Sequence, residues 1–365
     1  MRTDDFQRKA YYHQFMLYSL IKPLLFSLSP EKAHDSVLGL AKLSPTLGKI
    51  SGFTPDPKLS IKVGSVEWKS SVALAAGLDK NAEALSFFAN QGFGAIECGT
   101  ITLRPQVGNP KPRMWRYPED KSLRNAMGFP NHGLLEILPR LKTYSDSTPI
   151  GANIGKNKDS TPEESIEELS ILMETLHDHV NYFVINVSSP NTPGLRALQE
   201  KSYLTELFQE LKHTRHGKDL YLKIAPDLEE RKIIELAHLV HEHKLTGMIA
   251  TNTTIIPEKG MGGVSGELLT QKSRLVRQTI LKEKLPIELI GVGGISSSKE
   301  LFDFWKDGGK AAQIYTAYVY QGAGVLKNIQ KDIQKMLKAH ELKTLSDFFN
   351  LDLMDRKKIL DHYPG

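Results

Sequence analysis

Eight short apolar runs recur along this 365-residue chain, and each ends at small polar residues or glycine. Continuous apolar runs are typical of parallel strands that are buried on both faces of a sheet. Segments with helical periodicity separate the runs, so the sequence predicts a (β/α)₈ barrel. The predicted strands are residues 72–76, 94–96, 150–154, 182–187, 220–224, 247–249, 287–292 and 312–315.

The segment after the third run begins with strong helix-start signals. Thr161 is a capping residue, Pro162 stands at the first helical position, and Glu164 follows three residues after the cap. This pattern predicts a helix that begins at Pro162.

Residues 59–70 alternate apolar and polar side chains around Gly64 and Ser65. Alternation around a short glycine turn predicts a β-hairpin, which we expect to close the bottom of the barrel. Residues 339–365 have only weak helical character, and the sequence assigns them no role.

Two helices are predicted in the first 50 residues. Residues 15–28 are strongly apolar but broken by Pro23, and a second helix has Ser29 as its cap and Pro30 at its first position. Either the pair packs on the barrel, or it lies in a membrane interface with its apolar face in the lipid, since both places favour one apolar face. That face of the second helix consists of Ala33, Val37, Leu40 and Ala41.

The composition is that of a soluble globular protein with a large core, with 40% hydrophobic and 24% charged residues. The net charge is only +5, and the scattered Lys and Arg argue against nucleic-acid binding. A single cysteine, Cys98, excludes an internal disulfide and favours a reducing compartment. No run approaches the ~18 apolar residues of a spanning helix, and Asp4 and Asp5 argue against a signal peptide.

Polar residues gather where the predicted strands end, which is the face on which barrels of this class place their active sites. After a single strand, such residues are often only turn formers. No His-x-His, His-Glu-x-x-His or carboxylate cluster follows a strand, so no catalytic metal is expected. The residues that converge at the strand ends are Lys80, Asn153, Asn186, Lys223, Asn252 and Thr253.

Glycine-rich segments near the end of the barrel predict a phosphate site. Residues 291–296 (GVGGIS) follow the seventh run and residues 315–316 the eighth, where such barrels commonly bind phosphate. Residues 262–266 offer another flexible loop before a helix. Lys223 is either a snorkelling surface lysine or an inward cation that stabilises an anion, for example a reduced flavin.

An ordered series of motifs from about residue 59 to 330 resembles the dihydroorotate dehydrogenase family. The motifs are AAGLDKNAE, GFGAIECGTITLRPQVGNPKPRMWR, NAMGF, NIGKNK, INVSSPNTPGLR, KIAPDL, IATNTT, GGVSG, IGVGGI and QIYTA, with SPEKAH upstream. The resemblance implies an FMN-containing (β/α)₈ barrel that oxidises (S)-dihydroorotate to orotate in pyrimidine (UMP) biosynthesis.

Residues 186–194 (NVSSPNTPG) separate the branches of that family. The soluble enzymes have a cysteine as the base in this loop, whereas the membrane-associated, quinone-reducing branch (class 2) has a serine. Ser189 stands in that place, and the resemblance therefore implies a quinone as electron acceptor. In that branch the amino-terminal helices form the mouth of a quinone tunnel on the membrane.

The resemblance also divides the chain and places the protein. It implies a membrane-associating quinone-tunnel module at 1–50, a linker and hairpin at 51–71, an FMN-binding barrel at 72–338 and a tail at 339–365. We expect a peripheral protein on the cytoplasmic side of the cell inner membrane, because no Arg/Ser-rich presequence precedes the helices. Met1 and Met16 are both possible starts.

The resemblance assigns roles residue by residue. Ser189 would be the catalytic base, and His34, Arg116 and Tyr315 would line the quinone site. The family's usual arginine in the substrate loop is replaced by Ala126. FMN would contact Ala76, Gly77, Thr100, Asn153, Asn186, Lys223, Thr251, Gly266, Gly294, Tyr315 and Thr316. Dihydroorotate would contact Lys80, Asn125, Ala126, Met127, Gly128, Phe129, Asn186, Asn191, Asn252 and Thr253.

Two alternatives stay open on the sequence. Another FMN-dependent barrel oxidoreductase, such as a dihydropyrimidine-type reductase, would share the strand-end glycines and Lys223 but not the whole asparagine set. A non-catalytic membrane-bound barrel would keep the fold and lose the polar strand ends.

Overall fold

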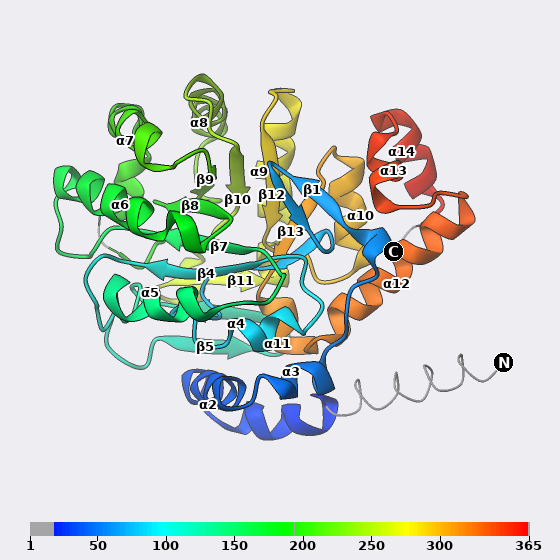
Figure 1. Cartoon of the computed structure of the whole chain (residues 1–365), viewed down its shortest axis with the longest axis horizontal. Coiled ribbons are helices and arrows are strands. Elements are labelled where there is room, and N and C mark those ends of the chain that lie inside the picture. The colour runs from blue at the N-terminus through cyan, green and yellow to red at the C-terminus, as the bar shows by residue number, and fades with distance from the viewer. Residues whose placement is uncertain (1–17, 193, 364–365) are drawn as a thin grey trace.

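The computed structural model describes residues 18–192 and 194–363. Within them, eight parallel strands close into a barrel, which confirms the predicted (β/α)₈ fold (Figure 1). Nearly all residues of these strands are buried, which is why the strands read as continuous apolar runs. In order around the barrel they are β3 (Val72–Leu74), β4 (Ile96–Ile101), β7 (Ile150–Ile154), β8 (Tyr182–Asn186), β9 (Asp219–Ile224), β10 (Gly247–Ala250), β12 (Glu288–Val292) and β13 (Ala311–Ile314).

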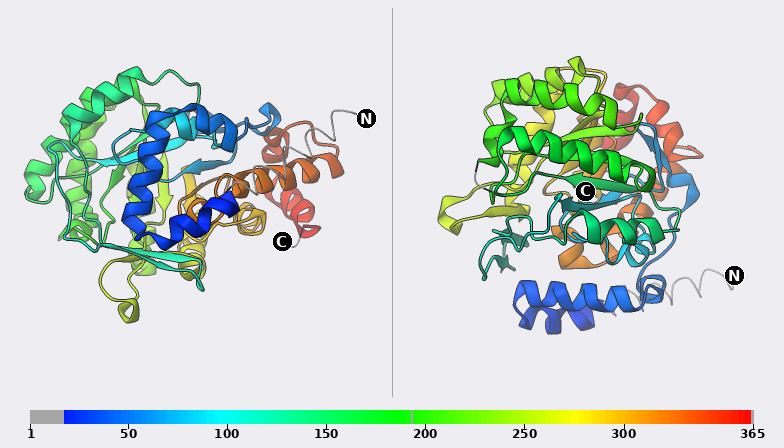
Figure 2. Two further views of the ribbon diagram at one scale, coloured as in Figure 1. Left: turned by 90° about the horizontal axis from the view of Figure 1, so that it is seen from below. Right: turned by 60° about the vertical axis from the view of Figure 1, so that its left-hand side comes forward.

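Helices follow the strands and cover the outside of the barrel (Figures 1 and 2). The third begins as predicted: the Thr161 hydroxyl accepts from the Glu164 N–H, and the Glu164 carboxylate accepts from the Thr161 N–H. The helices are α4 (Leu85–Ala89), α5 (Leu134–Thr143), α6 (Pro162–Leu176), α7 (Lys201–Thr214), α8 (Glu230–Glu242), α9 (Thr270–Lys282), α10 (Ser298–Lys306), α11 (Thr316–Gln321) and α12 (Gly324–Ala339).

The second strand differs from its prediction. It was expected at 94–96, but β4 begins at Ile96 and continues to Ile101. The polar residues Glu97 and Thr100 lie inside this strand and are buried. Their hydrogen-bond partners come from other strands, so an apolar pattern along the chain could not reveal them.

The predicted hairpin is confirmed as β1 (Ile61–Val63) paired with β2 (Val66–Trp68). At its turn, the Ser65 N–H and hydroxyl donate to the Asp219 carboxylate at 2.6 and 3.0 Å. Asp219 is the first residue of β9, so the hairpin covers the N-terminal ends of the strands. Gly64 is required there, because its φ is +58° and a Cβ would lie 2.3 Å from the same carboxylate.

A three-stranded antiparallel sheet that the sequence did not predict stands beside the mouth of the barrel. It consists of β5 (Met114–Tyr117), β6 (Ser122–Asn125) and β11 (Gly263–Gly266). The segment expected as a flexible glycine loop at 262–266 is therefore mostly the third strand of this sheet. Its pairing joins residues about 140 positions apart, such as Asn125 and Gly263.

The amino-terminal helices form a separate layer below the barrel in Figure 1 and again in the right view of Figure 2. Residues 18–27 are helical, followed by α2 (Pro30–Leu43) and α3 (Thr46–Ser51). Contrary to expectation, the first helix continues through Pro23. Its last turn is fixed by tertiary contacts, with Phe26 packed edge-on against Tyr320 at 5.4 Å. Residues 15–17 and the alternative start Met16 lie outside the described residues.

The carboxy-terminal tail folds into α13 (Leu345–Asn350) and α14 (Leu353–Asp361). Phe348 is fully buried and packs against Trp305 of α10 with ring centroids 5.5 Å apart. These helices lie beside β1, away from the amino-terminal layer (Figure 1). Short 3₁₀ turns connect other elements: η1 (Pro57–Leu59), η2 (His177–His179), η3 (Leu195–Gln199), η4 (Pro257–Lys259) and η5 (Glu267–Leu269).

Candidate active site

A cavity opens at the C-terminal ends of the barrel strands, and we call it the barrel-mouth cavity. Ser189 lines it, together with ten of the eleven residues predicted to hold FMN. The exception is Asn153, which lies behind the wall and accepts hydrogen bonds from Thr100 at 2.6 Å and Asn186 at 3.1 Å. The ten residues are Ala76, Gly77, Thr100, Asn186, Lys223, Thr251, Gly266, Gly294, Tyr315 and Thr316.

Nine of the ten residues predicted to bind dihydroorotate line the same cavity. Ala126 does not, although its backbone is held by hydrogen bonds to Arg113 and Asn109. The nine are Lys80, Asn125, Met127, Gly128, Phe129, Asn186, Asn191, Asn252 and Thr253.

One wall of the cavity contains a buried ion pair. Lys223 of β9 donates to the Glu97 carboxylate of β4 at 3.1 Å, and both side chains are almost completely buried. Lys223 therefore points into the barrel and is not a surface lysine. Gln313 of β13 also lines the cavity and donates to Glu97. Sequence reasoning missed Glu97 and Gln313; the only signal was a polar residue inside an apolar strand.

Ser189 lines the cavity from the loop after β8, and the residue is only 5% exposed. Its hydroxyl accepts a hydrogen bond from the Asn191 N–H at 3.2 Å. The Asn191 amide in turn donates to Asn125 of β6 at 2.9 Å. The loop is thus fixed both to itself and to the small sheet. Thr192 has a buried hydroxyl without a hydrogen-bond partner among the described residues, and Pro193 lies outside them.

Arg196 holds the backbone of the Ser189 loop. Its guanidinium donates to the carbonyls of Ser188 and Thr253, both at 3.0 Å, and to the Asp227 carboxylate at 2.8 Å. The loops after β8, β9 and β10, three neighbouring strands of the barrel, are thereby joined. Sequence reasoning did not reveal this contact, because Asp227 and Thr253 lie 31 and 57 residues from Arg196.

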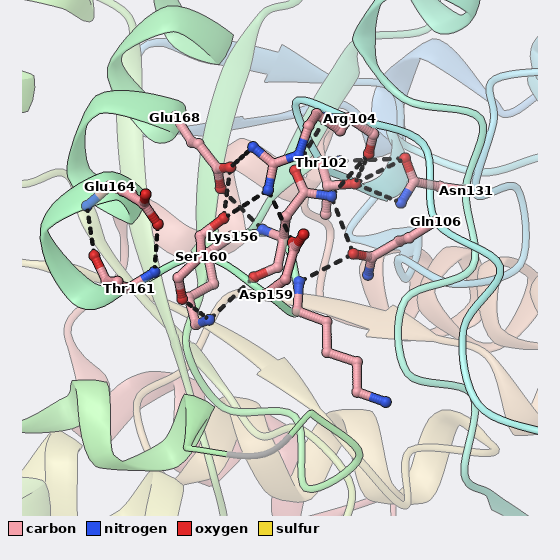
Figure 3. Close-up of polar contacts among 12 residues, drawn as sticks. Thr102, Arg104, Gln106, Asn131, Lys156, Asp159, Ser160, Thr161, Glu164 and Glu168 are labelled. Carbon is pink, nitrogen blue, oxygen red and sulfur yellow. Dashed lines mark hydrogen bonds and ion pairs between the residues drawn. The ribbon is translucent and has the colours of Figure 1, made fainter.

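The loop that carries Met127, Gly128 and Phe129 is supported from behind. Gln106 donates to the carbonyls of Gly128 and Phe129 at 3.2 and 3.1 Å, and Asn131 donates to the Phe129 carbonyl at 2.9 Å. Figure 3 shows how Gln106 and Asn131 belong to a larger polar network with the Arg104–Glu168 ion pair. The loop is therefore fixed through its backbone, which does not depend on the side chain at position 126.

Lys80 reaches the cavity with its ammonium group, which donates to the Gly77 carbonyl at 2.6 Å. Burial lowers the pKa of Lys80 to about 8, although the nearby carboxylate of Asp79 acts in the opposite direction. An anionic ligand beside the ammonium group would favour its charged form.

The part of the cavity lining that follows β12 has glycines in place of side chains. Gly293 and Gly294 follow β12 with φ of +99° and +72°. A Cβ on Gly294 would lie 2.3 Å from Thr270, so only glycine fits. Thr316 stands nearby at the start of α11, and its hydroxyl lies 2.8 Å from the Ser265 hydroxyl. A glycine backbone next to hydroxyl groups suits a phosphate, and the amides and Lys223 suit a planar polar ring, so the residues fit FMN.

A second cavity lies between the amino-terminal helices and α11, and we call it the tunnel cavity. Apolar side chains such as Leu25, Val37 and Leu38 dominate its lining. All three predicted quinone residues, His34, Arg116 and Tyr315, line it. It adjoins the barrel-mouth cavity, because Met114, Leu123, Tyr315 and Gln321 line both.

The polar groups of the tunnel cavity are few and well defined. Burial, assisted by the charge of Lys80, holds the pKa of His34 well below its usual value, so the imidazole is neutral at pH 7. Arg116 donates to the carbonyls of Phe26 and Leu28 at 3.2 and 2.9 Å, and its guanidinium lies 4.6 Å from the centre of the Phe26 ring. Arg116 therefore fixes the end of the first helix as well as lining the cavity.

Glu174, His177 and His216 form a surface group whose ligand atoms lie within 4.8 Å of one another. His216 contacts the Glu174 carboxylate at 2.7 Å, which accounts for the close approach. The three residues line neither the barrel-mouth cavity nor the tunnel cavity.

Comparison with known proteins agrees with this geometry. The family model described as dihydroorotate dehydrogenase matches residues 58–337. The dihydroorotate dehydrogenase (quinone) of Sulfurimonas denitrificans is 40% identical over 336 residues, covering 88% of this chain and 95% of the relative. The dihydroorotate dehydrogenase (quinone) of Christiangramia forsetii is 39% identical over 344 residues, covering 88% of this chain and 100% of the relative.

Solved structures agree as well. The dihydroorotate dehydrogenase of Eimeria tenella in complex with ferulenol superposes with a TM-score of 0.79 at 30% identity, over 93% of this chain and 99% of that one. The ligand-free form of the Eimeria tenella protein gives the same TM-score at 31% identity, over 92% of this chain and 100% of that one. The chain therefore belongs to the dihydroorotate dehydrogenase family, in its quinone-dependent (class 2) branch.

Proposed function

We propose that this protein oxidises (S)-dihydroorotate to orotate in pyrimidine biosynthesis, with FMN as its cofactor and a membrane quinone as the electron acceptor. The observation that carries the proposal is the pair of adjoining cavities, one with amide and charged side chains in its lining and the other almost entirely apolar, with Tyr315 lining both. A polar substrate and an apolar acceptor need separate sites that reach a common redox group, and this arrangement offers them.

The residues named above would hold FMN in the barrel-mouth cavity. When bound, FMN supplies the acceptor for the hydride from C6 of dihydroorotate and the electron donor for the quinone. Lys223 presents a positive charge to the cavity, which favours a ligand that gains negative charge.

Ser189 is the proposed base that removes the proton from C5 of dihydroorotate. A serine hydroxyl is a weak base, so the proposal needs a shielded position and a fixed orientation. Burial shields the Ser189 hydroxyl from water, and the hydrogen bond from the Asn191 N–H fixes its orientation. Cys98 cannot replace it, because this thiol lies on β4 outside the cavity lining and burial raises its pKa.

Lys80 is proposed to bind the carboxylate of dihydroorotate, and the surrounding amides to bind its ring. Asn125, Asn191 and Asn252 present side-chain amides at the cavity and come from three different segments. Amide groups both donate and accept, which matches the ring N–H and C=O groups of the substrate.

The amino-terminal helices are proposed to lie on a membrane surface and to admit the quinone. They carry exposed apolar side chains outside both cavities: Leu20, Leu24 and Leu43 are 67 to 83% exposed. Exposed apolar side chains of this kind favour the boundary of a lipid bilayer. No helix among the described residues is long and apolar enough to cross a membrane. We therefore propose a peripheral position on the cytoplasmic side of the cell inner membrane.

Flavin colour tests the proposal. The purified protein should be yellow, should bleach under anaerobic conditions when dihydroorotate is added, and should regain its colour with a quinone but not with fumarate or NAD. Failure of dihydroorotate to bleach a flavin-loaded protein would contradict the proposed substrate. Recovery with fumarate or NAD in place of quinone would contradict the proposed acceptor.

A further inference from the structure

Glu97 is a completely buried carboxylate in the middle of the barrel. One of its oxygens accepts from Asn153 of β7 at 2.8 Å and from Lys223 of β9 at 3.1 Å. The other accepts from Gln313 of β13 at 2.5 Å. Three strands that are distant in sequence therefore meet at this one side chain on β4.

The buried position of the Glu97 carboxylate requires a physical explanation. A carboxylate transferred from water to a protein interior is costly unless it is paired and hydrogen-bonded, and an apolar residue would be the ordinary occupant of a barrel strand. Glu97 is not in the lining of either cavity. Its partners Lys223 and Gln313 do line the barrel-mouth cavity, so Glu97 acts on that cavity only through them.

Glu97 also connects the ion pair to the rest of the wall. Asn153, which donates to Glu97, accepts from Thr100 and Asn186, and both of these line the cavity. The hydrogen bonds of this network are donated toward Glu97. Thr100 and Asn186 donate to Asn153, and Asn153 donates to the carboxylate. A neutral side chain at position 97 would leave Lys223 without a counter-charge and would disturb this direction.

We infer that Glu97 is a positioning residue that fixes Lys223 and sets the net charge that the wall presents to the electron-accepting ring of the cofactor. This inference rests on the proposed flavin site. The ion pair with Glu97 partly compensates the positive charge of Lys223. Loss of the carboxylate would leave a full positive charge beside the ring, which would favour the more negative, reduced form.

The test compares the reduction equilibrium of the bound flavin in wild type and E97Q, by titration against a reference dye with a chemical reductant. We expect the equilibrium to shift at least tenfold toward the reduced form, which for a two-electron couple is about 30 mV. D219N is the matched control, because Asp219 is a buried carboxylate at the opposite end of the same strand as Lys223. Its equilibrium should be unchanged. The inference is overturned if the reduction equilibrium of the flavin in E97Q equals that of wild type, or if D219N shifts it by as much as E97Q does.

A second measurement does not need the flavin. Thermal unfolding of the apoprotein is compared for E97Q, K223M and the double variant, because each single change leaves one buried charge unpaired whereas the double change leaves none. The double variant should be more stable than the sum of the single effects predicts, and it should fold even if E97Q does not. Additive effects overturn the inference.

A failure of the proposed function can be distinguished from a failure of the inference about Glu97. The dye titration uses no dihydroorotate, so a protein that is not bleached by dihydroorotate refutes the proposed substrate while the shift in E97Q still stands or falls on its own.

Discussion

The barrel-mouth cavity and the tunnel cavity adjoin, but they are built in opposite ways. The first is made by strand ends, with a buried ion pair between Lys223 and Glu97 and side-chain amides held by hydrogen bonds. The second is made by amphipathic helices, with apolar side chains and a neutral His34. Fixed charges and amides select a planar polar ligand, whereas an apolar lining selects by size and hydrophobicity. One molecule thus holds two cavities of different chemical character side by side, with Tyr315 lining both.

The two regions also differ in how firmly they are packed. Every residue of β4, β7 and β8 is buried, whereas Ala33 and Ala41 are the only buried residues of α2. Most of the hydrophobic core belongs to the barrel, so the barrel should fold without the amino-terminal layer.

Removal of residues 1–50 should separate the two sites most completely. The truncated protein should keep its flavin and should still be reduced by dihydroorotate, because the barrel-mouth cavity belongs to the barrel. Turnover with a long-chain quinone and binding to vesicles should be abolished. Stopped-flow absorbance of the flavin measures the first half-reaction, and steady-state quinone reduction measures the second. Normal turnover with a long-chain quinone would mean that the tunnel cavity is not its site.

Ser189→Ala should affect only the polar site. We expect the flavin to remain bound and the rate of its reduction by dihydroorotate to fall roughly 10²–10⁴-fold, as is typical when a general base is removed. Reoxidation by quinone should be unchanged, because Ser189 does not line the tunnel cavity. Ser189→Cys should restore part of the rate with a shifted pH optimum. A normal rate of flavin reduction in Ser189→Ala would exclude this residue as the base.

The double variant Leu20→Glu/Leu43→Glu should weaken membrane binding and leave the barrel-mouth cavity unaffected. Both side chains are more than two-thirds exposed, so the change should leave the fold intact. Each leucine buried in a lipid interface contributes on the order of 1.5–3 kcal/mol, and partial burial of two makes a loss of roughly 10- to 100-fold in vesicle affinity the expected result. Co-sedimentation with vesicles measures the affinity, and flavin reduction by dihydroorotate should stay normal. Unchanged vesicle binding would show that these side chains do not contact the membrane.

Lys80 gives the smallest of these effects, a pH dependence confined to the polar site. Its pKa is lowered to about 8, so the ammonium group is charged below that pH and loses its proton above it. The kcat/KM for dihydroorotate should therefore fall about tenfold for each pH unit above 8, while kcat changes little because the bound carboxylate keeps Lys80 protonated. Lys42→Met, an exposed site outside both cavities, should keep the same profile. A flat kcat/KM up to pH 9.5 would argue against Lys80 as the carboxylate ligand.

Local patterns predicted those elements whose stabilising contacts are local or repeat regularly. The strand Ile150–Ile154, the capping box of Thr161 and the hairpin turn at Gly64 and Ser65 are found where the sequence placed them. In each case neighbouring residues, or a run of mostly apolar residues, specify the structure. The strand around Glu97 was placed wrongly, because its polar groups are satisfied by partners more than 50 residues away.

The sequence by itself determined the barrel, the polar character of its strand ends and, through the motifs from AAGLDKNAE to QIYTA, the family. Only the tertiary structure decided that Lys223 points inward to Glu97, that Arg196 joins the loops after β8 and β10, and that Met114, Leu123 and Gln321 line both cavities. The physical reason is that apolar periodicity records which faces are buried, whereas hydrogen bonds and ion pairs between distant segments exist only once the strands are brought together.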